Sequence, residues 1–92
     1  MKTISLKITV MGHVQMVGFR WFAKRQADIL GIKGYAKNTS RGEVEILAQG
    51  DSELMPQFLD YMKIGPSRAR VNRLQKEDMI TDKIYDNFLI KM

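Results

Sequence analysis

Two short stretches of the sequence carry residue types that could bind an anion and direct a water molecule onto it. The first is the glycine-bounded turn of residues 12–20, GHVQMVGFR, between an expected strand and an expected helix. N–H groups at a helix N-terminus lack intrahelical partners, and together with the helix dipole they favour an anion. Arg20 adds a guanidinium whose planar fork matches two phosphate oxygens. The turn is therefore a candidate phosphate site, and its spacing alone leaves an ordinary structural turn as the alternative.

The second stretch is the expected hairpin of residues 34–44, GYAKNTSRGEV. Asn38 lies at the end of its first strand, and an amide can donate one hydrogen bond while accepting another, as a residue that holds a water must. The alternative is a local hydrogen bond from the Asn38 side chain to its own backbone at the turn. We interpret His13 as a solvent-facing loop residue, and Trp21 and Tyr35 as packing or surface aromatics rather than stacking platforms.

Hydrophobic periodicity predicts the strands that must position these residues. Alternation with a period of two predicts a strand at residues 4–10, and later alternation predicts four more. These further strands are expected at residues 32–37, 43–48, 69–76 and 88–90. The alternation of the fourth strand slips before Leu74, as a β-bulge would cause.

Helical spacing of apolar residues predicts a helix over residues 19–30 that Gly31 closes. A second helix is expected to begin at a cap on Asp51 or Ser52 and to stop at Gly65-Pro66. The order β-α-β-β-α-β, with an extra short C-terminal strand, predicts an α+β fold of the ferredoxin-like kind. In this sandwich an antiparallel sheet carries both helices on one face. No linker divides the chain, so we expect a single domain over residues 1–92.

Composition excludes several classes of protein. The 92 residues include no cysteine, so disulfides, thiolate catalysis and cysteine-bound zinc are excluded. His13 is the single histidine, and the carboxylates form no motif for Mg²⁺ or Ca²⁺, so we expect no metal and no cofactor. The first ten residues are too polar for a signal peptide, and no apolar run approaches the roughly 20 residues of a membrane span. We therefore expect a cytoplasmic protein.

The net charge of +5 lies in one half of the chain. Residues 1–46 hold eight basic and three acidic side chains, whereas residues 47–92 hold seven of each. A basic half is compatible with a nucleic-acid surface, with an anionic small substrate, or with a solvated surface that has no specific partner.

Both stretches also match the signatures of a known family. The first signature, G-x-V-Q-G-V-x-F-R, is met by Gly12, Val14, Gln15, Val17, Phe19 and Arg20. The second, which runs from a glycine and an aromatic residue to a glycine sixteen positions later, is met by Gly34, Tyr35, Ala36, Asn38, Gly42, Val44 and Gly50. With these residues the chain resembles the acylphosphatase family. The likeness extends to Gly65-Pro66, Ala69-x-Val71 and Phe88-x-Ile90, so it covers essentially the whole chain.

The resemblance implies an acylphosphatase, an enzyme that hydrolyses the carboxyl-phosphate bond of acyl phosphates without a metal or a covalent intermediate. By position, Arg20 corresponds to the arginine that binds the phosphate, and Asn38 corresponds to the asparagine that orients the attacking water. The phosphate-binding loop would be completed by backbone amides of Gln15, Met16, Val17, Gly18 and Phe19. The partner would be a small-molecule acyl phosphate, with no nucleic acid and no membrane. We expect a monomer, because basic side chains on both edge strands discourage pairing between chains.

One position departs from the signature. Met16 stands where the family usually has glycine, and a positive φ there would cost a side chain roughly 1–2 kcal/mol. An inactive family member that binds an anion or a partner is therefore one alternative. An RNA-binding module is more distant: Lys33-Gly34-Tyr35-Ala36 matches the start of an RNA-recognition motif, but Lys37 and Asn38 do not continue it.

Overall fold

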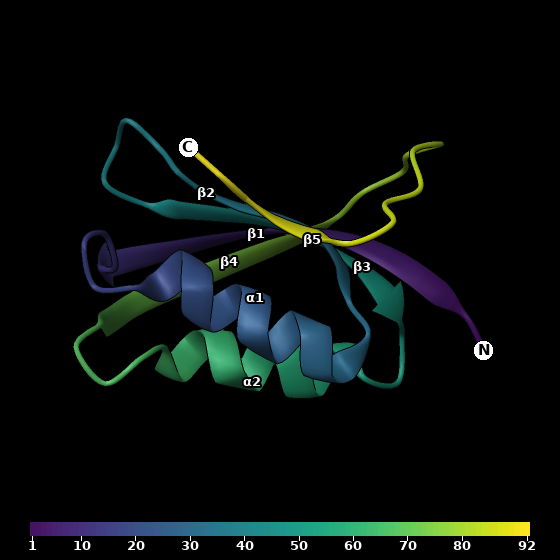
Figure 1. Cartoon of the computed structure of the whole chain (residues 1–92), viewed down its shortest axis with the longest axis horizontal. Coiled ribbons are helices and arrows are strands. Elements are labelled where there is room, and N and C mark those ends of the chain that lie inside the picture. Colours follow the sequence, from purple (N-terminus) through teal and green to yellow (C-terminus); the bar gives the residue numbers. More distant parts are fainter.

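Five strands form one sheet, and two helices lie against it (Figure 1). The computed structural model describes residues 1–92. The strands are β1 Thr3–His13, β2 Lys33–Asn38, β3 Val44–Asp51, β4 Arg70–Asp78 and β5 Phe88–Lys91, and the helices are α1 Phe19–Leu30 and α2 Met55–Ile64. The sheet order is β4-β1-β3-β2-β5, and both helices cover the same face. The predicted ferredoxin-like α+β fold is confirmed. Neither helix is long and apolar enough to cross a membrane.

The last strand departs from the antiparallel pattern. β1 pairs antiparallel with β3 and β4, and β2 pairs antiparallel with β3, whereas β5 runs parallel to β2. The chain leaves β4 at one edge of the sheet, passes through residues 79–87 and reaches the opposite edge at the end where β2 begins. There Gly34 N donates a hydrogen bond of 3.0 Å to Asn87 O, and Gly34 pairs with Phe88. The two strands must therefore run in the same direction.

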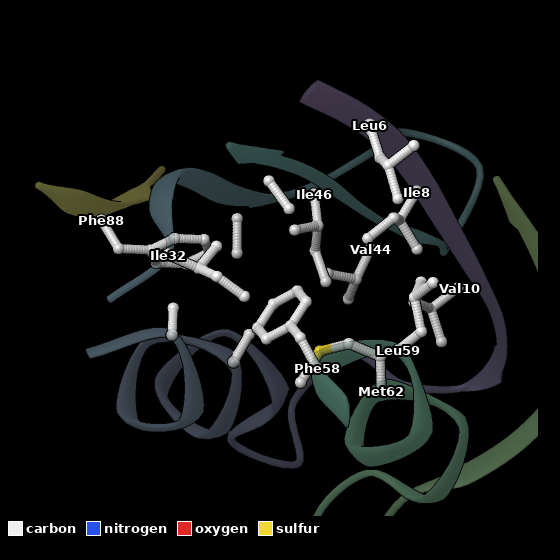
Figure 2. Close-up of a cluster of buried hydrophobic side chains, with 14 of the residues drawn as sticks. Leu6, Ile8, Val10, Ile32, Val44, Ile46, Phe58, Leu59, Met62 and Phe88 are labelled. Carbon is white, nitrogen blue, oxygen red and sulfur yellow. The ribbon is translucent and has the colours of Figure 1, made fainter. Parts of the chain in front are cut away.

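The core lies between the helices and the sheet, and it follows the predicted alternation (Figure 2). Alternate residues of β1 point at the helices, and Ile8 and Val10 are fully buried. On α1 the buried side chains include Ala23 and Ala27, whose small size lets this helix lie close to the sheet. Phe58 of α2 fills the space between the layers. This packing fixes the end of β1 and the start of α1 on one rigid body.

The predicted start of the second helix is wrong. α2 begins at Met55 after Leu54, and no side chain caps it. Asp51 ends β3 opposite Thr3, and Ser52, in the turn that follows, donates its N–H to Lys2 O at 2.8 Å, so both residues bond to the start of the chain instead. The Asp51 carboxylate accepts a bond from Glu53 N in the intervening turn. Because Asp51 and Ser52 bond to the start of the chain, neither is available to cap α2.

The predicted bulge in β4 is confirmed, and it lies beside the candidate phosphate turn. Met11 pairs with Arg73 and Gly12 with Val71, so Asn72 is the extra residue. A Cβ at Gly12, where φ is +131°, would collide with the carbonyl oxygen of Arg70. Glycine therefore allows the close approach of β4 at the point where β1 leads into the loop.

Candidate active site

The candidate phosphate loop, residues 15–19, connects β1 to α1 and alternates in backbone handedness. Met16 has φ +63° and Gly18 has φ +78°, whereas the other three residues have negative φ. Alternating handedness turns successive N–H groups toward a common concave side, which is the geometry of an anion-binding nest. None of the five backbone N–H groups donates a hydrogen bond within the chain. The loop therefore offers a set of free donors at the N-terminus of a helix.

Met16, which stands where the family signature has glycine, adopts the left-handed backbone conformation that favours glycine. The side chain is 95% exposed, so no packing compensates the backbone cost of about 1–2 kcal/mol. The alternation of the loop is thus kept without glycine at this position.

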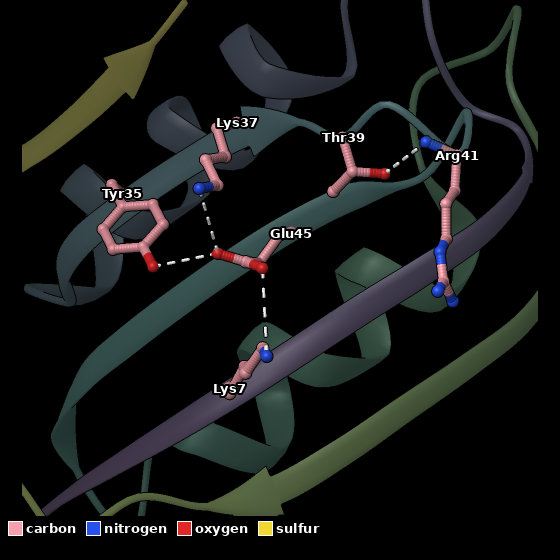
Figure 3. A network of polar contacts seen from close by, with 6 residues as sticks. All are labelled: Lys7, Tyr35, Lys37, Thr39, Arg41 and Glu45. Atoms are coloured by element: carbon pink, nitrogen blue, oxygen red, sulfur yellow. Dashed lines mark hydrogen bonds and ion pairs between the residues drawn. The ribbon is translucent and has the colours of Figure 1, made fainter.

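The side chain of Gln15 ties the loop to the β2–β3 hairpin. Its Nε2 donates to Thr39 O and to Glu43 O, both at 2.9 Å. Thr39 Oγ1 in turn accepts hydrogen bonds from the backbone N–H groups of Arg41 and Glu43, and Figure 3 draws the first of these. These bonds therefore hold the loop and the hairpin together, and Figure 1 shows both segments at the same end of the sheet.

The local turn bond that we considered for Asn38 is made by Thr39 instead. No hydrogen bond of the Asn38 side chain occurs among those of the structure, and Asn38 is half-buried at the end of β2. Sequence reasoning missed the side-chain roles of Gln15 and Thr39. A threonine at the start of a turn is a signal for the second role, since its hydroxyl can accept from turn N–H groups.

Arg20 lies in the first turn of α1 and is held by the last strand. Its Nη1 donates to Lys91 O at 2.7 Å and lies 3.9 Å from Met92 Sδ. Arg20 forms no ion pair, because every ion pair of the structure involves lysine. Its positive charge is therefore positioned by a neutral carbonyl and is not compensated by a carboxylate.

Arg20 and Asn38 line the same hollow. This hollow has a volume of about 190 Å³, and its walls are Val14, Met16, Gly18, Phe19, Arg20, Trp21 and Asn38. Of the predicted site residues, Gln15 and Val17 do not line it: Gln15 reaches the hairpin, and Val17 packs against the core. His13 is exposed at the end of β1, as expected, and does not line it either.

A larger hollow of about 530 Å³ lies away from the loop, on the open face of the sheet that the helices leave uncovered. Its walls are Lys7, Thr9, Gln75, Lys76 and Glu77, with no apolar side chain. We place the candidate site at the smaller hollow, because only there do free backbone donors, a guanidinium and an amide converge.

Glu45 organises the open face (Figure 3). Its carboxylate lies 3.9 Å from Lys7 Nζ and 3.7 Å from Lys37 Nζ, and it accepts a 3.0 Å hydrogen bond from Tyr35 Oη. Burial, with this hydrogen bond and the carboxylate charge as further causes, raises the pKa of Tyr35 to about 12. Tyr35 is therefore a neutral donor committed to Glu45, which agrees with its interpretation as a packing aromatic.

A ferredoxin-like sandwich with a loop of free N–H donors between its first strand and first helix places the chain among small α+β domains with a candidate phosphate site. Within that class, the sequence model of one family, acylphosphatase, matches residues 6–90. The chain therefore belongs to the acylphosphatase family, and it is an enzyme, a hydrolase. The resemblance stated from the two signatures is confirmed.

Relatives match over nearly the whole chain. An acylphosphatase from Actinobacillus succinogenes is 38% identical over 88 residues, which are 96% of this chain and 98% of that protein. One from Thermotoga maritima is 44% identical over 87 residues, which are 95% and 96% of the two chains. The solved acylphosphatase from Bacillus subtilis superposes with a TM-score of 0.92 at 31% identity, covering 97% of this chain and 99% of that one.

Proposed function

We propose that the chain hydrolyses the carboxyl-phosphate bond of acyl phosphates, releasing a carboxylate and inorganic phosphate. The proposal is supported by the family to which the chain belongs and by its relatives, which are named acylphosphatases. The observation that carries the mechanism is the hollow that Arg20 and Asn38 line together beside the phosphate loop.

The phosphate is bound by the loop and by Arg20. Free N–H groups of residues 15–19 point to one side of the loop, and the helix dipole of α1 adds positive potential there. Nη1 of Arg20 is fixed by Lys91 O, so the other guanidinium donors are free for the phosphate oxygens. Donors held in place before the reaction stabilise the charge on the equatorial oxygens at no cost of reorganisation.

Asn38 orients the attacking water. Its amide can accept a hydrogen bond from the water and donate one, and no other side chain competes for it. The water oxygen forms a bond to phosphorus while the bond from phosphorus to the acyl oxygen breaks. The carboxylate leaves with the bonding electrons, and the proton of the water passes to the phosphate product. Because a carboxylate is a good leaving group, positioning replaces a strong general base.

The test is hydrolysis of benzoyl phosphate and acetyl phosphate by the purified chain and its variants. Arg20→Ala and Asn38→Ala should each lower kcat at least about 100-fold, as the loss of a transition-state donor does elsewhere. Arg25→Ala on the same helix and Ser40→Ala on the same hairpin are matched controls, because both residues are exposed and neither lines the hollow. Both controls should keep the activity of the unmodified chain.

Two results would contradict the proposal. Absence of turnover in the unmodified chain, together with thermal protection by inorganic phosphate, would favour an inactive anion-binding member of the family. Full activity of Asn38→Ala would remove this residue from the mechanism.

A further inference from the structure

The hollow is lined by both polar and apolar residues. Four of its seven walls are apolar, and two of these, Val14 and Phe19, belong to the core and are almost fully buried. The other two are exposed to solvent: Met16 is 95% exposed and Trp21 is 62% exposed. The opening of the hollow therefore carries two large apolar side chains that bury little surface in the fold.

Single exposed apolar residues are common on proteins and need no explanation. Ile29 and Ile64, for example, are exposed on the two helices, and neither lines this hollow. Met16 differs because it also holds a left-handed backbone that glycine would adopt without strain. Backbone strain that no packing of the side chain compensates is typical of residues at functional sites.

The orientation of an acyl phosphate follows from the site. The backbone donors of the loop and Arg20 hold the phosphate on the inner side, so the acyl group must extend toward the opening. There it meets the methionine thioether and the indole ring, both of which make favourable contacts with apolar and aromatic groups.

We infer that Met16 and Trp21 form an apolar rim that binds the acyl group and makes the enzyme prefer aromatic and other bulky acyl phosphates to acetyl phosphate. This inference rests on the proposed function. It assigns the substrate class to two side chains that are not needed to hold the phosphate or the water. Each contributes by burying apolar surface of the substrate, an effect that scales with the size of the acyl group.

The kinetic test compares kcat/KM for benzoyl phosphate with that for acetyl phosphate. The ratio should fall about tenfold in Trp21→Ala and about threefold in Met16→Ala. In Trp21→Ala, which lies outside the phosphate loop, kcat/KM for acetyl phosphate should change less than about twofold. Inhibition by inorganic phosphate should stay unchanged, since the phosphate contacts are intact. Ile29→Ala is the control, because it removes another exposed apolar side chain of α1 that does not line the hollow. An unchanged ratio, or an equal loss for both substrates, would overturn the inference.

A binding test separates this inference from the proposed hydrolysis. Trp21 is the single tryptophan of the chain, so its fluorescence reports directly on the rim. Phenacylphosphonate, an analogue with CH₂ in place of the scissile oxygen, should shift the emission to shorter wavelength, whereas inorganic phosphate should not. If the analogue shifts the emission but neither substrate is hydrolysed, the result supports binding of the acyl group by the rim and contradicts the proposed hydrolysis. Displacement of bound phosphate by the analogue without a change in emission would overturn the rim.

Discussion

Two glutamine side chains fasten irregular segments to opposite ends of the sheet, and they do so differently. At one end, Gln15 uses only its amide nitrogen, which donates to two carbonyls of the β2–β3 hairpin. At the other end, Gln49 of β3 uses both amide atoms on the segment of residues 79–87: Nε2 donates to Lys83 O, and Oε1 accepts from Tyr85 N. Nε2 of Gln49 also donates to Ser5 Oγ on β1.

The difference separates a structural amide from one that positions a site. Gln49 is 8% exposed, and the segment that it holds lines no part of the candidate site. Gln15 is half-buried and connects the loop of free N–H donors to the hairpin that begins after Asn38. Loss of Gln49 should therefore reduce mainly stability, and loss of Gln15 should reduce mainly turnover.

Of the two glutamines, Gln15 should give the larger effect when it is replaced, and the effect of Gln15→Ala should be on turnover. Without its two hydrogen bonds the loop and the hairpin can move apart, and a misplacement of about 1 Å costs roughly 100-fold in rate. We expect kcat/KM for benzoyl phosphate to fall about 10- to 100-fold, with a loss of stability of only about 1 kcal/mol. Gln57→Ala on the exposed side of α2 is the matched control. If Gln15→Ala keeps the kcat/KM of the unmodified chain, Gln15 does not position the site, and the proposed difference between Gln15 and Gln49 is wrong.

Gln49→Ala should give the opposite result. Three hydrogen bonds are lost at a buried amide, so we expect the free energy of unfolding to fall by about 1–3 kcal/mol in a urea titration. The specific activity of the folded protein should stay within about twofold. Gln75→Ala, on the exposed edge strand β4, should change neither quantity. A loss of activity larger than the loss of stability explains would show that residues 79–87 are coupled to the site.

Periodicity predicted the elements, because burial of one face of each strand and helix leaves a direct mark on the sequence. It could not predict where α2 begins. Asp51 and Ser52 are good capping residues, but Asp51 pairs with Thr3 in the sheet and Ser52 N donates to Lys2 O in the turn that follows. The parallel pairing of β5 was also missed, since the direction of a four-residue strand depends on the path of residues 79–87.

The sequence predicted which residues form the candidate site, but only some of the contacts that hold them in place. Local sequence predicts a turn of free N–H groups before α1, and the family signatures single out Arg20 and Asn38. Neither predicts that Lys91 O would hold Arg20, a contact across 71 residues, or that Gln15 would fasten the hairpin. Such contacts form only when the sheet has assembled. They join segments that are distant in sequence, and the local hydrophobic pattern of one segment does not indicate where the other will lie.

A smaller effect is expected from Met16→Gly at the Gln15 end. Glycine relieves the left-handed strain but has more freedom in the unfolded chain, so the net gain in the free energy of unfolding should be about 0.5–1 kcal/mol. Met16→Ala keeps the strain and is the matched control, which should show no gain. A loss of stability in Met16→Gly, measured by urea titration, would mean that the methionine side chain supports the loop after all.

An effect confined to alkaline pH concerns Tyr35, whose ring packs on Tyr85 of the segment that Gln49 holds. Burial, the hydrogen bond to Glu45 and nearby negative charge raise the pKa of Tyr35 from 10.0 to about 12. Between these values the unfolded chain loses the phenol proton while the folded chain keeps it, so this contribution to stability is complete below pH 10 and is lost as pH rises toward 12. The unfolding midpoint in urea should therefore fall less steeply from pH 10 to 12 in Tyr35→Phe than in the unmodified chain. Tyr61→Phe is the control: it removes a phenol that lacks the Glu45 contact, so it should keep the steeper fall. Equal slopes for both variants would mean that the phenol of Tyr35 ionises as easily in the fold as outside it.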